Sequence, residues 1–524
     1  MKKKLFKVSA LLLIVSMAFS SCLFGCRKSD EDTQAKGSGT KATASAGKTA
    51  AKSMETTKGT STGTASGSLS AGRTPSTSEQ QGGNESEGEQ EQSGSDNSLP
   101  SEYAVEKTFD LQGRVIRVIC SLKESLQWPV EDGTRLGEVR TKMVKEAEEK
   151  FNCKFAFELF TSWEQLQSDV ENSVMAGVYY ADVVRMQRTI AFPKWEKNNI
   201  ILPLNDYIDF DQPVYKQYDQ IHGLLNPDKI YSFFICGFLT PIGVFYNKDL
   251  LAREGLPDIH ELADNGQWNW ETFADMAMKL THDFNGDGII DQWGAGADNS
   301  STMCISFMRS NLAAMIDRTD DNKFVYNLYD PKALRALQFV SDLYTHYKVI
   351  PSSSVLPYFQ KGQAAMYIKD AWYGANLQKA GLTNFGFEIM PDGPDNPGTG
   401  YMREQGSHMF FFPSNIKDPE GVVNAVAYWN VLWDESKSDY LTVEDMLLSG
   451  AQTYFTSEED IDNFIDIMKT RKIYYDYIGY FDPAQDEMRK AVFYPISVKA
   501  SSPVSSIESL RSMIENIIED ALAK

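Results

Sequence analysis

The chain has 524 residues, of which 42% are hydrophobic and 23% are charged, so it can bury the cores of more than one domain. Its 51 Lys and Arg against 72 Asp and Glu give a net charge of −21, which disfavours nucleic-acid binding because phosphate backbones attract clustered basic residues. No run of 18 apolar residues occurs, which excludes a permanent membrane-spanning helix within this sequence.

Residues 1–26 have the pattern of an export signal. A lysine-rich start precedes a short apolar stretch at 8–19, which is too short to span a bilayer. Bacterial lipoprotein signals end in a Leu-small-small-Cys box, and two cysteines compete for that position. Cys26 follows Leu-Phe-Gly and is preferred, Cys22 follows Phe-Ser-Ser and is the alternative, and a plain secretory signal is a third possibility. Acyl chains such as palmitate would hold the protein on the extracellular face of the cell membrane, in a Gram-positive type of bacterium.

Residues 27–102 are predicted to be a disordered tether. Up to residue 100, 36 of 74 positions are Ser, Thr or Gly, and the later part is rich in Glu. Such a segment cannot bury enough apolar surface to offset its ordering entropy. As a flexible coil it would reach roughly 45–50 Å, which suits a globular body held away from a membrane.

The four cysteines beyond the signal are expected to be buried free thiols. Each of them, Cys120, Cys153, Cys236 and Cys304, lies among apolar residues. Pairing outside the cell is the alternative.

From about residue 103 onward, strand and helix patterns alternate along the chain. Predicted strands lie at 114–120, 153–159, 180–186, 243–246, 364–368 and 409–412, and predicted helices lie at 136–151, 163–175, 270–280, 331–347 and 422–433. This alternation predicts parallel sheets covered on both faces. A body of this size is expected to divide into two α/β lobes with a ligand cleft at the carboxyl ends of the strands.

The strongest local motif is a loop that resembles a calcium-binding loop. Asp283, Asn285, Asp287 and Asp291 supply oxygen side chains at positions 1, 3, 5 and 9, and Ile289 can offer its carbonyl at position 7. Position 6 is glycine, as a tight turn requires, but position 12 is also glycine, so the usual bidentate glutamate is absent. The sequence predicts a structural Ca²⁺ site here. An Asn/Asp/Gly turn held by its own hydrogen bonds is the alternative.

Patterns for catalysis are sparse, and no catalytic residue is assigned. The five histidines form no metalloprotease motif, and no acidic pair stands out as a glycosidase pair. Aromatic residues are the remaining candidates for a binding site, because their flat apolar faces pack on sugar rings. Trp372 and Tyr373 follow a predicted strand at the place where a cleft would open, and Trp128 lies in the polar loop after the first strand.

Five fragments occur in a characteristic order between about residues 105 and 515. They are ADVV at 181–184, LPLNDYI at 202–208, GVFYNKDLL at 243–251, WETF at 270–273 with the loop at 283–294, and FQKGQAAM at 359–366 followed by Trp372. Behind a lipoprotein signal, this order resembles family 1 extracellular solute-binding proteins, the substrate-binding lipoproteins of carbohydrate ABC importers. Asp370 departs from the family pattern, in which a glycine is common before that tryptophan.

The resemblance implies a two-lobed periplasmic-binding-protein-like α/β fold of the class II type. The first lobe would comprise 103–239 and 406–460, and the second lobe would comprise 240–405 together with 461–524, including the C-terminal helices. Hinge crossings near 238–241 and 405–407 would line a ligand cleft between the lobes.

The resemblance also implies a function. The protein would bind a sugar or oligosaccharide as a monomer, without catalysis, and deliver it to the permease subunits of an ABC importer. The implied ligand contacts are stacking on Trp372 and polar contacts from Gln187, Arg188, Thr240 and Arg403. A surface glycosidase or polysaccharide-processing enzyme is the alternative, and it would need two carboxylates roughly 5–10 Å apart in the cleft.

Overall fold

The computed structural model describes residues 109–121, 123, 128–212, 215, 220–233, 240–398, 400–404, 408–430, 442–497 and 504–523. Contacts divide the chain into Met1–Gln92 and Ser93–Lys524, and every described residue belongs to the second unit. The predicted signal with Cys22 and Cys26, the tether and Cys236 lie outside the described residues. Among the residues that are described, no helix has both the length and the apolar content needed to cross a bilayer.

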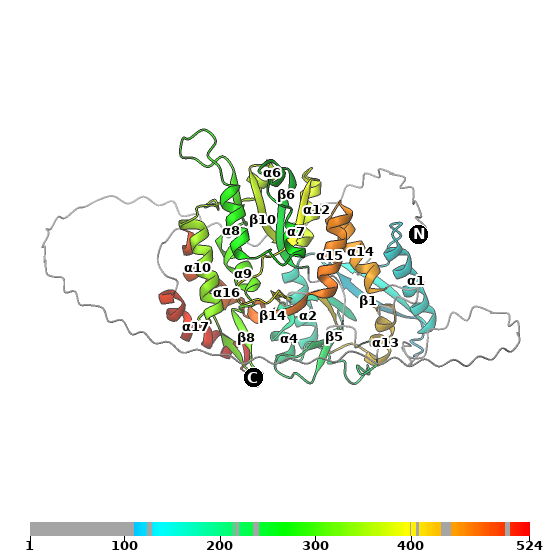
Figure 1. The fold of residues 1–524 in the computed structure, drawn as a ribbon. Coiled ribbons are helices and arrows are strands. Elements are labelled where there is room, and N and C mark those ends of the chain that lie inside the picture. Colours follow the sequence, from blue (N-terminus) through cyan, green and yellow to red (C-terminus); the bar gives the residue numbers. More distant parts are fainter. Residues whose placement is uncertain are drawn as a thin grey trace, which may run out of the picture. The chain divides into compact units, whose positions relative to one another are not determined.

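The first lobe is built on a four-stranded sheet with the order β13-β3-β1-β2 (Figure 1). Strand β1 (Arg114–Cys120) pairs in parallel with β2 (Cys153–Leu159) and β3 (Val183–Gln187), and β13 (His408–Phe411) is antiparallel to β3. One face of the sheet packs in an apolar cluster with α1 (Arg135–Lys150) and α13 (Pro419–Asn430). The other face shares a second cluster with α2 (Trp163–Met175). The remaining elements are α3 (Arg188–Ala191), α4 (Lys194–Lys197), β4 (Gln220–His222) and β5 (Ile230–Phe233).

The second lobe has a four-stranded sheet with the order β11-β6-β10-β7. Strand β10 (Ala364–Asp370) is parallel to β7 (Trp293–Gly296), whereas β6 (Ile242–Asn247) is antiparallel to both β10 and β11 (Phe385–Ile389). The other elements between β6 and β13 are α6 (Lys248–Arg253), α7 (Ile259–Asp264), α8 (Trp270–Lys279), α9 (Ser300–Ser310), β8 (Ile316–Arg318), β9 (Phe324–Tyr326), α10 (Pro331–Thr345), α11 (Leu356–Gln360), η1 (Ala371–Tyr373), α12 (Gly374–Lys379) and β12 (Gly400–Glu404).

Both sheets are mixed, which corrects the expectation of parallel sheets. Strands β1, β2 and β3 are linked by helices, and such crossover connections produce parallel neighbours. Strands β6 and β13 are the first strands of their lobes after the predicted hinge crossings, so no crossover helix constrains their direction. The alternation of strands and helices therefore predicted the helix-linked part of each sheet and not the strand that follows each crossing.

Local signals account for where the helices begin. Ser162 accepts a hydrogen bond from the Gln165 N–H at 3.1 Å and caps α2, and Asp330 caps α10 ahead of the proline at its first position. In helix α14 (Val443–Tyr454), Thr442 and Asp445 form a reciprocal capping box. Such caps satisfy N–H groups that have no partner within the helix.

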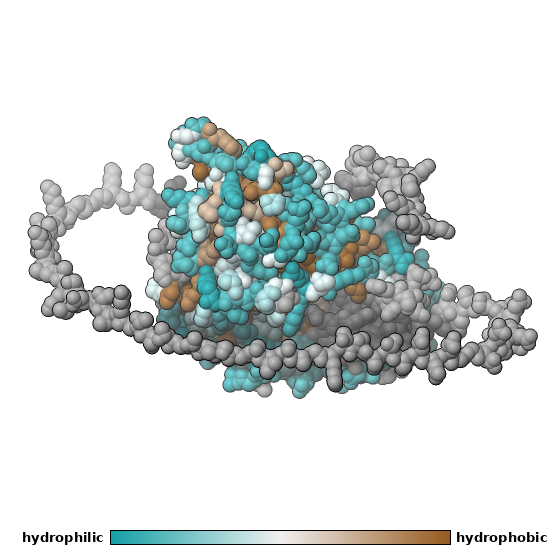
Figure 2. Space-filling view, in the orientation of Figure 1, coloured by the Kyte–Doolittle hydropathy of each residue, from teal (hydrophilic) through white to brown (hydrophobic). Residues whose placement is uncertain are grey.

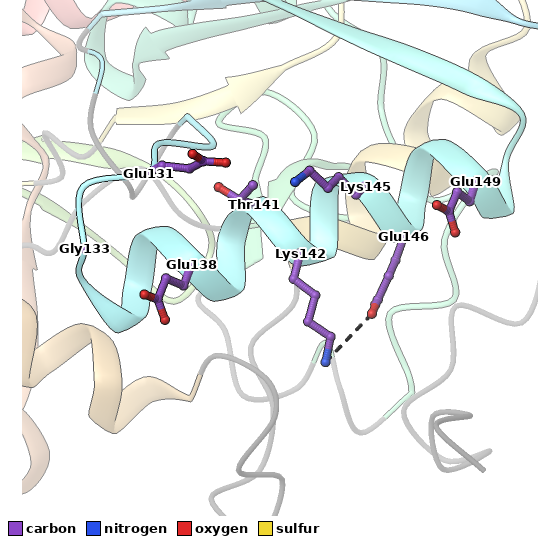
Figure 3. Close-up of a pocket in the computed structure, with 8 residues that line it drawn as sticks. All are labelled: Glu131, Gly133, Glu138, Thr141, Lys142, Lys145, Glu146 and Glu149. Carbon is purple, nitrogen blue, oxygen red and sulfur yellow. Dashed lines mark ion pairs between the residues drawn. The ribbon is translucent and has the colours of Figure 1, made fainter. Parts of the chain in front are cut away.

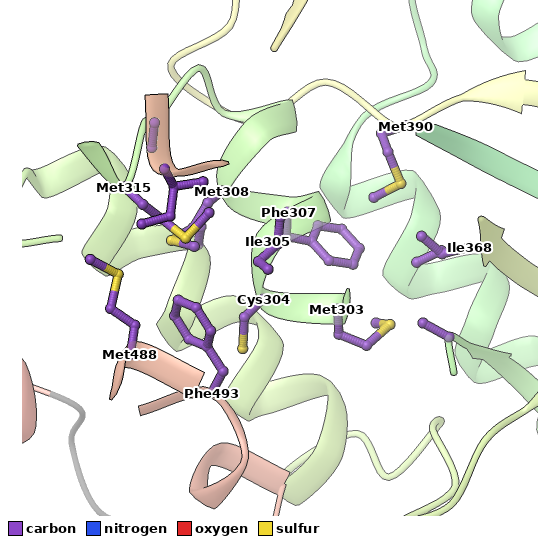
Figure 4. Packing of buried hydrophobic residues seen from close by; sticks show 14 of the residues in the cluster. Met303, Cys304, Ile305, Phe307, Met308, Met315, Ile368, Met390, Met488 and Phe493 are labelled. Carbon is purple, nitrogen blue, oxygen red and sulfur yellow. The ribbon is translucent and has the colours of Figure 1, made fainter. Parts of the chain in front are cut away.

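The C-terminal elements are α15 (Glu458–Thr470), β14 (Lys472–Asp476), η2 (Tyr477–Tyr480), α16 (Asp482–Met488), η3 (Arg489–Phe493), η4 (Pro495–Ser497) and α17 (Val504–Leu522). Strand β14 pairs in parallel with β12. Helix α9 packs on this region, and Figure 4 shows its Cys304 and Met308 close to Met488 and Phe493. Cys120, Cys153 and Cys304 are buried free thiols, which confirms the prediction for these three cysteines.

Helix α14, which the sequence placed in the first lobe, contacts both lobes. Its Met446 joins the apolar cluster of α1 and α13, and its Asp445 pairs with Arg135 of α1 at 2.8 Å. Ala451 and Phe455 join Phe245 of β6 in one apolar cluster. The close approach depends on Gly374 at the start of α12, because a Cβ there would lie 2.2 Å from the Tyr454 carbonyl oxygen. This boundary is set by a long-range fit between two elements, which local sequence patterns do not report.

A buried charged network ties α15 to the second sheet. His260 of α7 lies 3.0 Å from Glu388 Oε2 through Nδ1 and 2.9 Å from Asp460 Oδ1 through Nε2, and all three side chains are buried. Burial alone would lower the pKa of His260, but the hydrogen bonds to Asp460 and Glu388 outweigh it and raise the pKa to about 10. Asn463 of α15 adds a donor to Glu388 at 3.1 Å. Because each partner comes from a different segment, the protonated histidine holds three elements together.

We expect His260→Gln to lower the free energy of unfolding by about 3 kcal/mol at pH 6, because it leaves buried Glu388 without its cation and leaves Asp460 with Lys248 alone, 3.7 Å away. The pKa of His260 is raised by folding, so its contribution to stability is complete below its unfolded value near 6.5 and is lost as the pH rises towards 10. Urea unfolding of both proteins between pH 6 and 9.5 measures this difference. It should shrink with rising pH, whereas exposed His346→Gln should unfold like the wild type throughout. A difference that stayed constant across this pH range would contradict the assignment.

Candidate functional site

In the first lobe, strand pairing brings the carboxyl ends of three strands and the amino end of a fourth to one edge of the sheet. The parallel strands β1, β2 and β3 end there at Cys120, Leu159 and Gln187. Strand β13 runs the other way, so its first residue, His408, pairs with Gln187. This carboxyl edge is where open α/β sheets bind ligands.

The second lobe has an equivalent edge. Strands β7 and β10 end there at Gly296 and Asp370, and β11 ends at Ile389. Antiparallel β6 begins at the same edge, with Ile242 paired to Asp370. Thr240 therefore lies at this edge, as predicted from the sequence, and it is buried. The predicted crossings at 238–241 and 405–407 lie partly or wholly outside the described residues.

Trp372 and Tyr373 lie immediately after β10, in the 3-10 turn η1. The Trp372 side chain is 41% exposed, which is unusual for so large an apolar group, and its ring centroid lies 5.6 Å from that of Tyr373. The Lys369 ammonium lies over the Tyr373 ring at 5.4 Å. An indole face available to solvent next to a supported phenol ring is suited to stacking on the C–H face of a sugar.

Charged groups surround this aromatic pair. Asp298, two residues beyond β7, accepts hydrogen bonds from the Tyr367 hydroxyl at 2.8 Å and from Lys369 Nζ at 2.5 Å. Arg403 of β12 donates to Asp370 Oδ1 at 3.2 Å. These pairs hold both carboxylates as acceptors at the edge of the sheet and keep each of them beside a cation.

A second aromatic group, which the sequence analysis did not single out, lies at the edge of the first lobe. Trp163, the first residue of α2, stacks on the His408 ring with centroids 4.9 Å apart, and Phe160 lies 4.4 Å from Trp163. Burial, reinforced by the charge of Arg185, lowers the pKa of His408 to about 3, so its imidazole is neutral at physiological pH. The sequence signal for this group was the presence of two aromatic residues, Phe160 and Trp163, within four positions after the predicted strand at 153–159.

Gln187 and Arg188 lie at the end of β3 and the start of α3. Gln187 is half-buried, and the Arg188 guanidinium lies 5.9 Å from the centre of the Tyr480 ring in η2. Trp372, Tyr373, Thr240 and Arg403 thus gather at the edge of the second lobe, whereas Gln187 and Arg188 lie at the edge of the first.

Trp128 has a different environment from the other predicted ligand contacts. Its ring packs against Phe157 of β2, with centroids 5.4 Å apart, and it borders the apolar cluster beneath α1 and α13. The ring is half-buried, so its role as a ligand contact stays a prediction, and Trp163 is a further aromatic residue at the edge of the first lobe.

The loop with the calcium-like pattern extends beyond the end of α8 (Figure 1). Asp283 accepts hydrogen bonds from the Gly286 and Gly288 N–H groups at 2.7 and 2.8 Å, and Asn285 accepts one from Asp287 N at 2.9 Å. Asp287 and Asp291 bond to the N–H groups of Ile289 and Phe284, at 2.8 and 2.9 Å. These contacts are those of the turn alternative, and nowhere in the described ranges do three His, Cys, Asp or Glu side chains gather as a metal-binding group. The Ca²⁺ site stays a prediction.

The loop tip is apolar, with Phe284 63% and Ile289 69% exposed. The face drawn in Figure 2 is otherwise mostly hydrophilic, with small hydrophobic patches. The loop precedes β7 and therefore lies at the end of that strand opposite to Asp298 and Trp372, so its aromatic residue takes no part in the candidate site.

A hollow of about 550 Å³ follows helix α1 (Figure 3). Its lining is mainly charged, comprising Glu131, Gly133, Glu138, Thr141, Lys142, Lys145, Glu146 and Glu149. Lys142 and Glu146 lie 3.8 Å apart as an i, i+4 ion pair of the helix surface. Without an aromatic platform or a strand end in its lining, this hollow lacks the features of the edge sites.

Comparison with known proteins agrees with this architecture. The family model described as bacterial extracellular solute-binding protein matches residues 137–431. No protein in a search of curated sequences matches.

Solved structures show the same two-lobed fold. The sugar-binding protein MalE from Xanthomonas citri is 15% identical with a TM-score of 0.56, and the alignment covers 78% of this chain and 98% of that one. The maltose/maltodextrin-binding domain MalE from Bdellovibrio bacteriovorus, bound to maltotriose, is 17% identical with a TM-score of 0.51, covering 78% and 100%. An ABC substrate-binding protein from Listeria monocytogenes in complex with cycloalternan is 15% identical with a TM-score of 0.52, covering 77% and 98%.

Proposed function

The chain belongs to the bacterial extracellular solute-binding proteins, and we propose that it captures a sugar or oligosaccharide and delivers it to the permease of an ABC importer. The observation that carries this proposal is the exposed indole of Trp372 at the carboxyl edge of the second lobe, beside two ion-paired carboxylates. Family membership and the sugar ligands named for several structural neighbours support the same function.

Each lobe supplies one aromatic residue and several polar groups to such a ligand. Trp372 and Trp163 would stack on sugar rings, while Asp298 and Gln187 would accept or donate hydrogen bonds to hydroxyl groups. Ligand that contacts both lobes favours the closed arrangement, because binding shifts the population towards the form that it contacts most. A closed, loaded form is what a permease would recognise.

Binding without catalysis fits the charges at the second lobe better than the glycosidase alternative does. A glycosidase needs one protonated carboxylic acid and one free carboxylate. Asp298 is 2.5 Å from Lys369, and Asp370 is 3.2 Å from Arg403, so both carboxylates are already engaged in ion pairs. Carboxylates held in this way are placed to accept hydrogen bonds from sugar hydroxyl groups.

We expect Trp372→Ala to weaken sugar binding at least tenfold, about 1.4 kcal/mol, because it removes the stacking surface and leaves the fold intact. The ligand is first found by thermal shift across a panel of neutral and acidic mono- and oligosaccharides. Affinities are then measured by calorimetry, with chromatography of the incubated sugars to detect turnover. Phe284→Ala, which removes an exposed aromatic at the other end of β7, is the control and should bind like the wild type. Unchanged affinity in Trp372→Ala, or release of products, would refute the proposal.

The lipid anchor is part of the proposed function. Acylation at Cys26 would keep the receptor at the extracellular face of the membrane, where a permease could be reached over the length of the tether. In cells grown with labelled palmitate, the wild type should carry label and sediment with membranes, Cys26→Ser should lose both properties, and Cys22→Ser should keep them. The reverse result would assign Cys22, and release of all three proteins into the medium would rule out an anchor.

We also propose that the loop of Asp283 binds Ca²⁺ and that the ion stiffens it. Backbone N–H groups, Gly288 foremost, lower the pKa of Asp283, which keeps its carboxylate ionised as a cation requires. Millimolar Ca²⁺ should raise the melting temperature of the wild type and not that of Asp283→Ala, with Mg²⁺ as the comparison ion. If Ca²⁺ changed the melting temperatures of both proteins equally, the loop would be a turn held by its own hydrogen bonds and not a Ca²⁺ site.

A further inference from the structure

Arg188 is buried next to the candidate site without an acidic partner. It is only 8% exposed, and its Nε has no hydrogen-bond partner among the described residues. No Asp or Glu of the described chain forms an ion pair with it, and its guanidinium rests on the face of Tyr480 at 5.9 Å. A buried guanidinium is normally paired, because its desolvation is costly unless an anion compensates it.

Arg318 at the end of β8 is in a similar position. Its Nε and Nη2 are buried atoms without a hydrogen-bond partner among the described residues, and its guanidinium lies 5.4 Å from the centre of the Phe324 ring. Turn η2 contacts both α3, which begins at Arg188, and β8, which ends at Arg318. Burial raises the pKa of the Tyr480 hydroxyl, and the charges of Arg188 and Arg318 both act against that shift. Turn η2 is therefore packed between the two elements that carry these arginines.

Three carboxylates of these elements have other partners, and one of them, Asp317, accepts a hydrogen bond from the backbone N–H of Arg318 at 2.8 Å. Asp370 is paired with Arg403, whose own Nε is a further buried donor without a partner among the described residues. Buried Asp476 lies 3.6 Å from Arg309 and accepts from the N–H groups of Ile478 and Ile316 at 3.1 and 3.3 Å. Among the described residues, neither Arg188 nor Arg318 forms an ion pair.

Building on the proposed function, we propose that the ligand is an acidic carbohydrate whose carboxylate or sulfate group binds to Arg188 and Arg318. Guanidinium groups donate paired hydrogen bonds in a planar fork that matches a carboxylate or sulfate. Arg188 follows Gln187 at the carboxyl edge of the first lobe, so an anion held there belongs to the same site as the residues that contact sugar hydroxyls.

Local charge outweighs net charge in this selection. The net charge of −21 repels anions at long range, but that field is screened over roughly 8 Å at physiological salt. A direct contact with a buried guanidinium such as that of Arg188 is screened much less. A neutral sugar would leave both guanidinium groups uncompensated, whereas an acidic sugar would provide the missing partner.

The test is calorimetry on the full chain with a panel in which each acidic sugar is matched with its neutral parent. Galacturonate, glucuronate and their oligomers are compared with galactose, glucose and the corresponding neutral oligomers, and a sulfated chondroitin disaccharide with its desulfated form. Comparison of the uronates with the sulfated disaccharide shows whether the site prefers a carboxylate or a sulfate group. The wild type should bind at least one acidic member at least tenfold more tightly than its parent.

The variants Arg188→Gln and Arg318→Gln are each expected to remove that preference. Arg318 is only partly buried, so Arg318→Gln keeps the proposal testable should Arg188→Gln fail to fold. The matched control is Arg335→Gln. Arg335 lies on α10 and forms an ion pair with Asp395, and the variant should bind like the wild type.

The outcomes separate this inference from the proposed function. An acidic preference that both glutamine variants lose supports the acidic ligand. Binding of neutral sugars with equal or higher affinity, unaffected by Arg188→Gln, overturns the acidic ligand and leaves the sugar receptor standing. An absence of binding across the whole panel overturns both.

Discussion

Strand β13 enters the first sheet antiparallel to β3, which places its first residue, His408, beside Gln187 at the end of β3. Strand β6 enters the second sheet in the same manner, with Ile242 beside Asp370. In each lobe, the strand that follows a predicted crossing therefore begins at the edge where the helix-linked strands end. The location of the candidate site depends on this strand direction.

Charge pairing decides what this site can do. Asp298 and Asp370 each have a cationic partner and accept hydrogen bonds from it. The same reasoning gives the opposite result for Arg188 and Arg318, whose buried donors have no acidic partner among the described side chains. Buried charges are stable only when compensated. The unbalanced pair is therefore informative about the ligand, although the chain as a whole is strongly acidic.

Local patterns predicted much of the secondary structure. The predicted bounds of β1, β2 and α2 agree with the structure, because the β-branched run of β1, the alternating apolar residues of β2 and the serine cap of α2 are each encoded within a few positions. The placement of Trp372 after a compact strand was also correct, and its exposure is consistent with the predicted role. Trp163 was assigned only to a helix, because its contact with His408 joins residues 245 positions apart. For the same reason, the packing of Trp128 on Phe157 was not visible from its polar surroundings in the sequence.

By itself, the sequence determined the alternation of strands and helices, the oxygen-rich loop after α8, the aromatic pair after β10 and the resemblance to a solute-binding family. These features depend on residues that are close together in the chain, where periodicity, capping and turn chemistry act. Only the tertiary structure decided the direction of β6 and β13, the contact of α14 with the second lobe, and the packing of η2 against the elements that carry Arg188 and Arg318. The physical reason is that packing, desolvation and Coulomb interactions depend on distance in space, and segments separated by more than a hundred residues acquire that distance only through the fold.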